Sequence, residues 1–278
     1  MKVYMFHYVL KNFKYYHFDL DLFEIRLKEL LEKYRVISLS DFNHLITNNH
    51  DMNNCVMLTF DDATIDHYKY VYPILKKYNC SGLFFVASNV FNNSILNIQY
   101  IHRLLSLNCF DQIYDDFIQK LQENNVIVDD INIKDKIVYF KQNLQFKLEK
   151  KIRNKILNYL VDKYKVSKDF ENYYITKEQL KEMKENGMFI GLHTENHLNL
   201  SLLSYKQQKQ EVFDNLKKLK LFKLIDDDLI SIAYPFGYYD DDTLKIMREL
   251  GVKFGFKANT FGPLGDLEIN RIDCNELK

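Results

Sequence analysis

Short apolar segments alternate with amphipathic segments along most of this sequence, and this alternation restricts the possible folds more than any other feature. Strand-like segments occupy residues 3–9, 35–40, 55–60, 80–88, 188–193, 230–236, 253–259 and 268–274. Helical patterns occupy residues 19–34, a short stretch from Asp41, and residues 63–79, 177–186, 204–222 and 240–250. Such alternation predicts parallel strands joined by crossover helices, in either a closed barrel or an open sheet. In both architectures, ligands bind at the carboxyl ends of the strands.

The segment from about residue 89 to residue 174 departs from this alternation. Its patterns are mainly helical, at residues 98–106, 110–122 and 148–164. Only three prolines and eight glycines occur in the 278 residues, so no Pro- or Gly-rich linker divides the chain. We therefore expect a single domain over residues 1–278, with a mainly helical insert at about 89–174.

Charge and cysteine content exclude several classes of protein. The 38 basic and 38 acidic residues balance, so no net charge draws the chain to nucleic acid or to an anionic membrane. The four cysteines are widely spaced and form no C-x-x-C pair, which argues against a zinc ribbon or a disulfide framework and fits a reducing compartment. The N-terminal apolar stretch is too short for a signal peptide, and no run of 18 apolar residues exists. We expect a cytoplasmic protein, with a position at the inner face of a membrane left open.

Two adjacent carboxylates, Asp61 and Asp62, follow the apolar run "VMLTF". Successive side chains of a regular strand point to opposite faces, so a strand that continued could not aim both at one substrate. A strand that ends at this point can turn both carboxylates toward one mouth. Their mutual repulsion then requires a positive charge nearby.

The stretch "GLHTENH" supplies a candidate for that positive charge. His193 and His197 stand four residues apart, one helical turn, so both imidazoles can face one metal ion. Two neutral imidazoles and one carboxylate form a common ligand set for catalytic zinc. A lone H-x-x-x-H pair is a weak signal in a chain with eight histidines. Its combination with two carboxylates at a strand end favours a metal site over scattered polar residues.

Three short motifs resemble those of the polysaccharide deacetylases of carbohydrate esterase family four, the NodB homology domain. They are "TFDD" at 59–62, "HTENH" at 193–197 and "YPFG" at 234–237, in the order found in that family. The resemblance implies a distorted (β/α) barrel. It further implies that Asp62, His193 and His197 bind Zn²⁺ or another divalent transition metal such as Co²⁺ or Ni²⁺. Asp61 is then the general base, and the backbone N–H of Phe236 stabilises the oxyanion.

The sequence departs from the family pattern in two places. No histidine follows His197, whereas the usual relative carries its general acid near the C-terminus. Some relatives place the acid in an N-terminal aromatic–His pair, so His7 in "MFHYV" is our candidate, and a packed strand histidine is the alternative. The family's arginine before the proline motif is also absent, and Arg271 is the candidate replacement, against the alternative of a surface arginine. The remaining histidines are predicted to be surface or packing residues: His17, His44, His50, His67 and His102.

Together these features predict a metal-dependent hydrolase that removes an N-acyl group, with acetyl expected, from an amino sugar. The expected partner is an N-acylated sugar, an oligosaccharide or a lipid- or nucleotide-linked glycan precursor. Removal of a formyl group, O-deacetylation, hydrolysis of a non-sugar amide and a catalytically silent glycan-binding role remain alternatives. Aromatic residues at the predicted mouth suit either sugar stacking or wall packing: Tyr234, Phe236, Tyr238 and Tyr239. The insert at 89–174 is a candidate lid or docking surface.

Overall fold

The computed structural model describes residues 1–11, 17–92, 94–128, 135–168, 173–258 and 265–277. The chain forms two compact units. The first, here called the barrel unit, comprises Met1–Asn12, His17–Ser94 and Glu171–Lys278, and the second, the helical unit, comprises Phe13–Tyr16 and Ile95–Phe170. Among the described residues, no helix combines the length and the apolar character that a membrane crossing requires.

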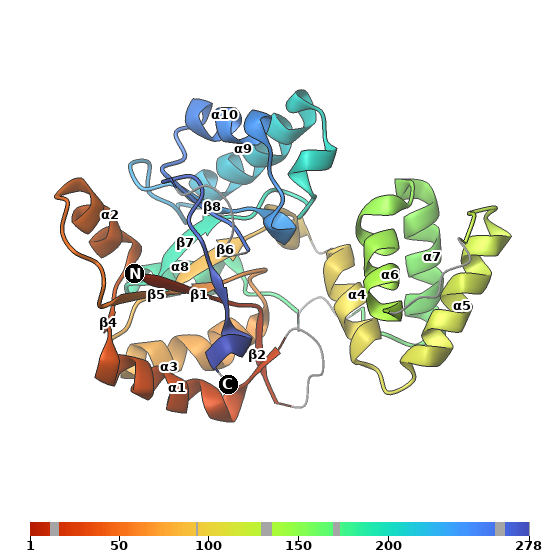
Figure 1. The fold of residues 1–278 in the computed structure, drawn as a ribbon, viewed down its shortest axis with the longest axis horizontal. Coiled ribbons are helices and arrows are strands. Elements are labelled where there is room, and N and C mark those ends of the chain that lie inside the picture. Colours follow the sequence, from red (N-terminus) through yellow and green to blue (C-terminus); the bar gives the residue numbers. More distant parts are fainter. Residues whose placement is uncertain (12–16, 93, 129–134, 169–172, 259–264, 278) are drawn as a thin grey trace. The chain divides into compact units, whose positions relative to one another are not determined.

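Parallel strands make up the main sheet of the barrel unit. The strands run in the order β10-β1-β5-β6-β7-β8-β9, and β4 also pairs with β5. Their bounds are Lys2–Phe6 (β1), Arg35–Val36 (β4), Cys55–Phe60 (β5), Leu83–Val86 (β6), Phe189–Leu192 (β7), Ser231–Ala233 (β8), Phe254–Phe256 (β9) and Ile272–Asp273 (β10). Figure 1 shows helices α1 and α3 on one side of these strands and α9 and α10 on the other. The predicted distorted (β/α) barrel is thus confirmed.

The segment from Gly265 to Asp273 links the two ends of this sheet. On one side Ile269 donates its N–H to the carbonyl of Gly255 in β9 at 2.8 Å, and its own carbonyl accepts from Lys257 N at 3.0 Å. Three residues later, Ile272 pairs with Tyr4 of β1. Arg271 therefore lies where the chain crosses from one edge of the sheet to the other.

The helices of the barrel unit are α1 (Leu20–Lys33), α2 (Leu39–Thr47), α3 (Tyr72–Lys77), α8 (Lys177–Glu185), α9 (Tyr205–Leu221) and α10 (Asp241–Glu249). All of them except α3 begin after a polar N-cap residue that the sequence supplies. Reciprocal side-chain-to-backbone bonds start α8 at Thr176 and Gln179. The helix predicted from Asp41 begins two residues earlier, because Ser38 is its N-cap and Asp41 completes the capping box. Gly187, with φ 84°, follows the end of α8.

Several predicted elements differ from the observed ones. The strand predicted at 3–9 is interrupted at His7, and Tyr8–Leu10 (β2) pairs instead with His17–Asp19 (β3) in a separate two-stranded sheet. The strands predicted at 35–40 and 268–274 shorten to β4 and β10. The helix predicted at 63–79 begins at Ile65 and passes through a π-helical turn over His67–Val71 (η1) into α3. The break at His7 goes with the pairing of β2 and β3, which hydrophobic periodicity does not encode, whereas β4 shortens because α2 begins at its N-cap Ser38.

Aromatic side chains of the apolar strands stack on one another near the carboxyl end of the sheet. All residues of β5 and β6 are buried, as expected for parallel strands that are covered on both faces. The rings of Phe6 and Phe60 stack at 5.1 Å, and those of Phe60 and Phe84 at 4.7 Å. These cross-strand pairs lie in register, at the last residues of β1 and β5 and inside β6.

The helical unit has its own apolar core. Its helices are α4 (Asn97–Ser106), α5 (Phe110–Glu123), α6 (Lys136–Gln142) and α7 (Lys150–Lys163), with a π-helical turn over Asn143–Lys147 (η3). The sequence predicted α4, α5 and α7 but not α6 or η3. Fully buried side chains of this core include Ile101, Phe117, Phe140, Leu144 and Leu160. These helices therefore bury a core among themselves.

Candidate active site

Both adjacent carboxylates lie at the carboxyl end of β5, and both are almost fully buried, with 2% and 1% of Asp61 and Asp62 exposed. Asp61 still donates its N–H to the carbonyl of Phe6 at 2.9 Å, as the last bond of the strand ladder. Asp62 and Ala63 then take left-handed backbone conformations, with φ of 73° and 51°. That turn ends the strand and gives the two carboxylates different neighbours.

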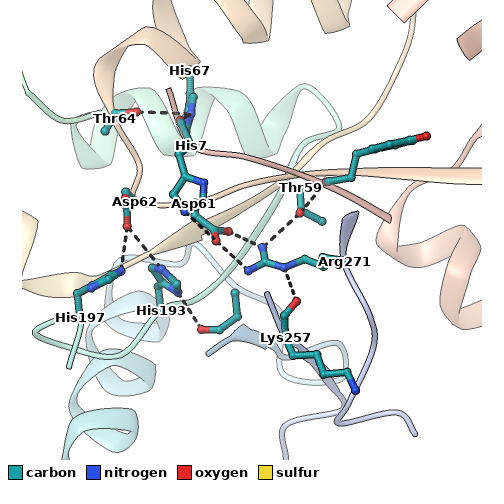
Figure 2. A network of polar contacts seen from close by, with 12 residues as sticks. His7, Thr59, Asp61, Asp62, Thr64, His67, His193, His197, Lys257 and Arg271 are labelled. Carbon is teal, nitrogen blue, oxygen red and sulfur yellow. Dashed lines mark hydrogen bonds and ion pairs between the residues drawn. The ribbon is translucent and has the colours of Figure 1, made fainter. Parts of the chain in front are cut away.

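Asp62 and two histidines form the one group within the described residues whose side chains could hold a metal ion: Asp62, His193 and His197. Their ligand atoms lie within 4.8 Å of one another. Asp62 Oδ1 is 3.5 Å from His193 Nε2 and 3.2 Å from His197 Nε2 (Figure 2). Burial acts to raise the pKa of Asp62, but the two imidazoles hold it well below its usual range.

This arrangement fits a cation. Asp62 Oδ1 is buried and has no hydrogen-bond partner in the described part of the chain. A buried carboxylate oxygen without a partner is costly unless a positive charge compensates it. Two imidazole nitrogens and one carboxylate oxygen are also the donors that zinc and its neighbours in the transition series accept.

Two hydrogen bonds fix His193 at the end of β7. Its Nδ1 donates to the carbonyl of Ala233 at 2.8 Å, so Nε2 faces Asp62 and, in the neutral imidazole, carries the lone pair. Its backbone N–H donates to Asn215 Oδ1 at 2.9 Å, and Asn215 Nδ2 donates in turn to the carbonyl of Val86 at 3.0 Å. Asn215, fully buried on α9, therefore ties the ends of β6 and β7 together.

A turn, not a helix, brings the second imidazole to the first. The sequence spacing predicted one helical turn, but Thr194 and His197 have φ of 62° and 54°. Glu211 on α9 holds this turn, because its carboxylate accepts from Asn196 N at 2.9 Å and from Asn196 Nδ2 at 2.7 Å. The prediction that both imidazoles face one point is thus met by a different backbone route, with ring centroids 4.7 Å apart.

Asp61 pairs with Arg271 instead. The guanidinium binds both carboxylate oxygens, with Nη1 2.6 Å from Oδ1 and Nη2 2.8 Å from Oδ2, and Nε donates to the carbonyl of Lys257 at 3.1 Å (Figure 2). Arg271 is 1% exposed, so the alternative of an ordinary surface arginine is wrong. Burial acts to raise the pKa of Asp61, yet Arg271 and His193 lower it overall. The carboxylate is therefore kept ionised, as a base requires.

His7 lies beside Asp61, at the break between β1 and β2. Its Nε2 is 3.9 Å from Asp61 Oδ2, and 22% of its side chain is exposed. Partial desolvation lowers the pKa of His7, while the charges of Asp61 and Asp62 act in the opposite direction. The candidate acid and the candidate base thus occupy the same end of the sheet, and their roles stay predictions.

The proline motif brings aromatic groups to the second imidazole. Phe236, in a left-handed conformation with φ 60°, sets its ring edge-on to His197 at a centroid distance of 4.6 Å. The role predicted for its backbone N–H is not tested by this geometry. Tyr234 is fully buried, donates its hydroxyl to the carbonyl of Leu267 at 2.8 Å and stacks on Tyr239, so it packs the wall. Tyr238 is 52% exposed.

One polar residue at this end of the sheet was not expected from the sequence. His67, predicted as a surface or packing residue, is fully buried and donates Nε2–H to the carbonyl of His7 (Figure 2). Nothing in the motif "DHYKY" signals this contact, because its partner lies 60 residues away in the chain.

Known sequences and structures resemble this chain. The sequence profile described as polysaccharide deacetylase matches residues 48–129 and 144–255, more than half of the chain. The Bacillus subtilis (strain 168) protein YxkH is 35% identical over 83 residues, 30% of this chain and 29% of that protein. A Staphylococcus aureus (strain MRSA252) protein named poly-beta-1,6-N-acetyl-D-glucosamine N-deacetylase is 32% identical over 97 residues, 31% of this chain and 33% of that protein. The matched stretches thus span about a third or less of these relatives.

A solved structure shares the fold over almost the whole chain. The Streptococcus pyogenes deacetylase PplD, solved in complex with acetate, superimposes with a TM-score of 0.64 and covers 98% of this chain and 91% of that chain. Sequence identity in this comparison is 24%, so the likeness concerns the fold.

Proposed function

Because the chain belongs to the polysaccharide deacetylase family, we propose that it is a metal-dependent hydrolase that removes an N-acetyl group from an amino sugar of a glycan or a glycan precursor. One observation carries the proposal. Two adjacent buried carboxylates have separate partners, two imidazoles for Asp62 and a guanidinium for Asp61. The name of the Staphylococcus aureus relative supports a polymer of N-acetylglucosamine as the first substrate to try.

Asp62, His193 and His197 would hold the metal ion. Zn²⁺ fits this donor set, and Co²⁺ or Ni²⁺ are the alternatives. When bound, the ion supplies Lewis-acid polarisation of the acyl oxygen and lowers the pKa of bound water toward ~7. His193 is prepared for such a role, because its Nδ1–H bond to Ala233 O keeps the Nε2 lone pair directed inward.

Asp61 is the base of the proposed reaction. Its two oxygens are held by Arg271, so the carboxylate keeps one orientation and stays ionised. It accepts a proton from the water whose oxygen bonds to the acyl carbon. As the water adds, negative charge develops on the acyl oxygen. Hydrogen-bond donors at the same end of the sheet stabilise this oxyanion, and the backbone N–H of Phe236 is our candidate donor.

His7 is the acid. An amide nitrogen leaves poorly as an anion, so the C–N bond breaks as an imidazolium donates a proton to that nitrogen. His7 Nε2 lies 3.9 Å from Asp61 Oδ2, which places the donor next to the base. The products are the free amine of the sugar and acetic acid, which ionises to acetate. The proton taken by Asp61 passes to solvent and His7 takes one up from solvent, so both groups return to their starting states.

Amine release from N-acetylglucosamine oligomers in the presence of zinc tests the proposal. We expect turnover by the wild type, and a loss of ~10²–10⁴-fold in Asp61→Asn, because a general base contributes a factor of that order. The amide oxygen of asparagine still accepts from Arg271, which makes this variant a conservative one. A wild type that is as inert as Asp61→Asn across a broad panel of acyl sugars, with metal bound, would support the silent glycan-binding alternative and refute the enzyme.

A further inference from the structure

The backbone at His7, the candidate acid, is held by side chains from the segment that follows Asp61 and Asp62. His67 and Asp66 are buried, with 0% and 2% exposed, although both are polar. Neither takes part in the reaction described above. Both reach across 57 and 60 residues of sequence to the backbone at and just after His7, the carbonyl of His7 and the N–H of Val9.

We propose that His67 and Asp66 are positioning residues that hold His7 in place as the proton donor. This inference rests on the proposed function, in which His7 protonates the leaving amine. Its content is separate, however, because it concerns two residues that touch neither the metal ligands nor the reacting atoms.

Three hydrogen bonds carry the inference. Asp61 N donates to Phe6 O at 2.9 Å, His67 Nε2 donates to His7 O, and Val9 N donates to Asp66 Oδ2 at 2.7 Å. The peptide groups before and after His7 are therefore bound to residues 61–67, the same segment that presents both carboxylates. The distance between acid and base is thus set within a single segment, rather than across two strands of the sheet that could shift against each other.

His67 itself sits in a rigid environment. Its ring contacts Phe60 and Phe84 at centroid distances of 5.4 Å and 5.9 Å, at the aromatic stack under the site. It also begins η1, and π-helical turns are frequent at functional sites. A carbonyl oxygen only accepts, so Nε2 must carry the hydrogen.

A phenylalanine would fill this aromatic position without burying polar nitrogen atoms. His67 Nδ1 has no hydrogen-bond partner in the described ranges, so the histidine leaves a buried polar atom uncompensated. What the histidine adds over a phenylalanine is the bond from Nε2 to His7 O and a longer contact, at 3.4 Å, between the same nitrogen and Thr64 Oγ1. The geometry thus connects the polar character of residue 67 with the placement of His7.

Placement matters for one class of substrate and not for another. A proton donor displaced by ~1 Å loses about 10²-fold in rate when its proton transfer is needed in the transition state. Hydrolysis of an amide needs that transfer, because the amine is a poor leaving group. An activated aryl ester such as 4-nitrophenyl acetate leaves as a stable phenoxide and needs no proton.

The experiment compares these two substrates in His67→Phe, His67→Gln and His7→Ala, all with zinc bound. We expect His67→Phe to lower kcat on N-acetylglucosamine oligomers by ~10–100-fold, with KM within about twofold and ester hydrolysis within about threefold of wild type. Glutamine carries an N–H donor at a similar reach, so His67→Gln should recover most of the lost amidase rate. His7→Ala should show the same selectivity with a larger loss.

Two kinetic outcomes would overturn the inference. If His67→Phe keeps the wild-type amidase rate, residue 67 does not position the acid. If it loses amide and ester hydrolysis equally, or if His67→Gln restores nothing, the role is merely structural.

A wild type that hydrolyses no amide refutes the proposed function. Whether His67 holds His7 in place is then decided by a crystal structure of the His67→Phe variant. His7 must be displaced from Asp61 in that structure, and an unmoved His7 would also overturn the inference.

Discussion

The two carboxylates at the end of β5 belong to two differently built halves of the site. On the metal side, formed by Asp62, His193 and His197, Asp62 Oδ1 faces two imidazoles and has no hydrogen-bond partner among the residues described. On the acid–base side, formed by His7, Asp61 and Arg271, both oxygens of Asp61 are bound by the guanidinium. In the acid–base half, the carboxylate already has its positive partner, whereas in the metal half a cation would compensate Asp62 Oδ1.

This difference explains how two adjacent buried acids can both stay ionised. Each carboxylate has its own nearest partner, Arg271 for Asp61 and the two imidazoles for Asp62, and His193 also lowers the pKa of Asp61. The supports are also separate. The metal side is held by α9 through Asn215 and Glu211, whereas Arg271 reaches Asp61 from the segment that links β9 to β1. Metal binding and acid–base chemistry should therefore respond to different substitutions.

The largest effect is expected from Asp62→Asn. Removal of this ligand should abolish stable metal binding and with it several kcal/mol of transition-state stabilisation, on the order of 10³-fold or more in rate. Asp61→Asn should lose activity but keep about one equivalent of metal. Metal analysis after dialysis of both purified variants measures the difference, and circular dichroism checks their folds. Equal loss of metal from both variants would show that the two halves are not separable.

A second large effect should appear in stability and not in metal content. Arg271→Met leaves Asp61 buried without its cation, which should destabilise the fold by ~3–5 kcal/mol. The exposed pair of Arg35 and Asp41, 3.0 Å apart, offers a matched control, because Arg35→Met should cost ~1 kcal/mol or less. Urea unfolding at one temperature gives both values. If the two substitutions lower the free energy of unfolding by the same amount, Asp61 does not depend on Arg271 for its charge compensation, and our description of the acid–base side is wrong.

The metal side was more accessible to sequence reasoning than the acid–base side. Asp62, His193 and His197 lie in short motifs at strand ends, and the βα alternation brings all such ends to one edge of the sheet. The backbone route was nevertheless missed, because the four-residue spacing of the histidines suits a helical turn as well as the observed turn with left-handed residues. Spacing constrains where side chains meet and leaves open how the backbone brings them there.

The acid–base side depends on contacts between distant parts of the chain. Arg271 and Asp61 are separated by 210 residues, and no local pattern distinguishes a buried arginine from an exposed one. The role of His67 is harder still to predict from the sequence, because its hydrogen bond goes to a backbone carbonyl, which any residue could supply. The predicted strand at 3–9 failed at His7 for the same reason. Apolar residues flank it on both sides, and only the pairing of β2 with β3 reveals the break.

The smallest effect should come from the support of the metal side. Asn215 bonds the backbone of His193 and of Val86, so Asn215→Ala should loosen the strand end without removing a ligand. Partners of this kind typically contribute ~10–100-fold to metal affinity, and the lower value applies here because His193 Nδ1 keeps its own bond to Ala233 O. At saturating zinc, kcat should stay within about threefold of wild type.

Competition with a zinc chelator measures this affinity. Gln210→Ala removes another amide from α9, at an exposed position, and should leave the affinity unchanged. If Asn215→Ala matches that control, α9 does not hold the metal side. If it lowers kcat at saturating zinc as strongly as it lowers affinity, the support of the metal ligand extends to the acid–base side, and the two halves are coupled through the ends of β6 and β7.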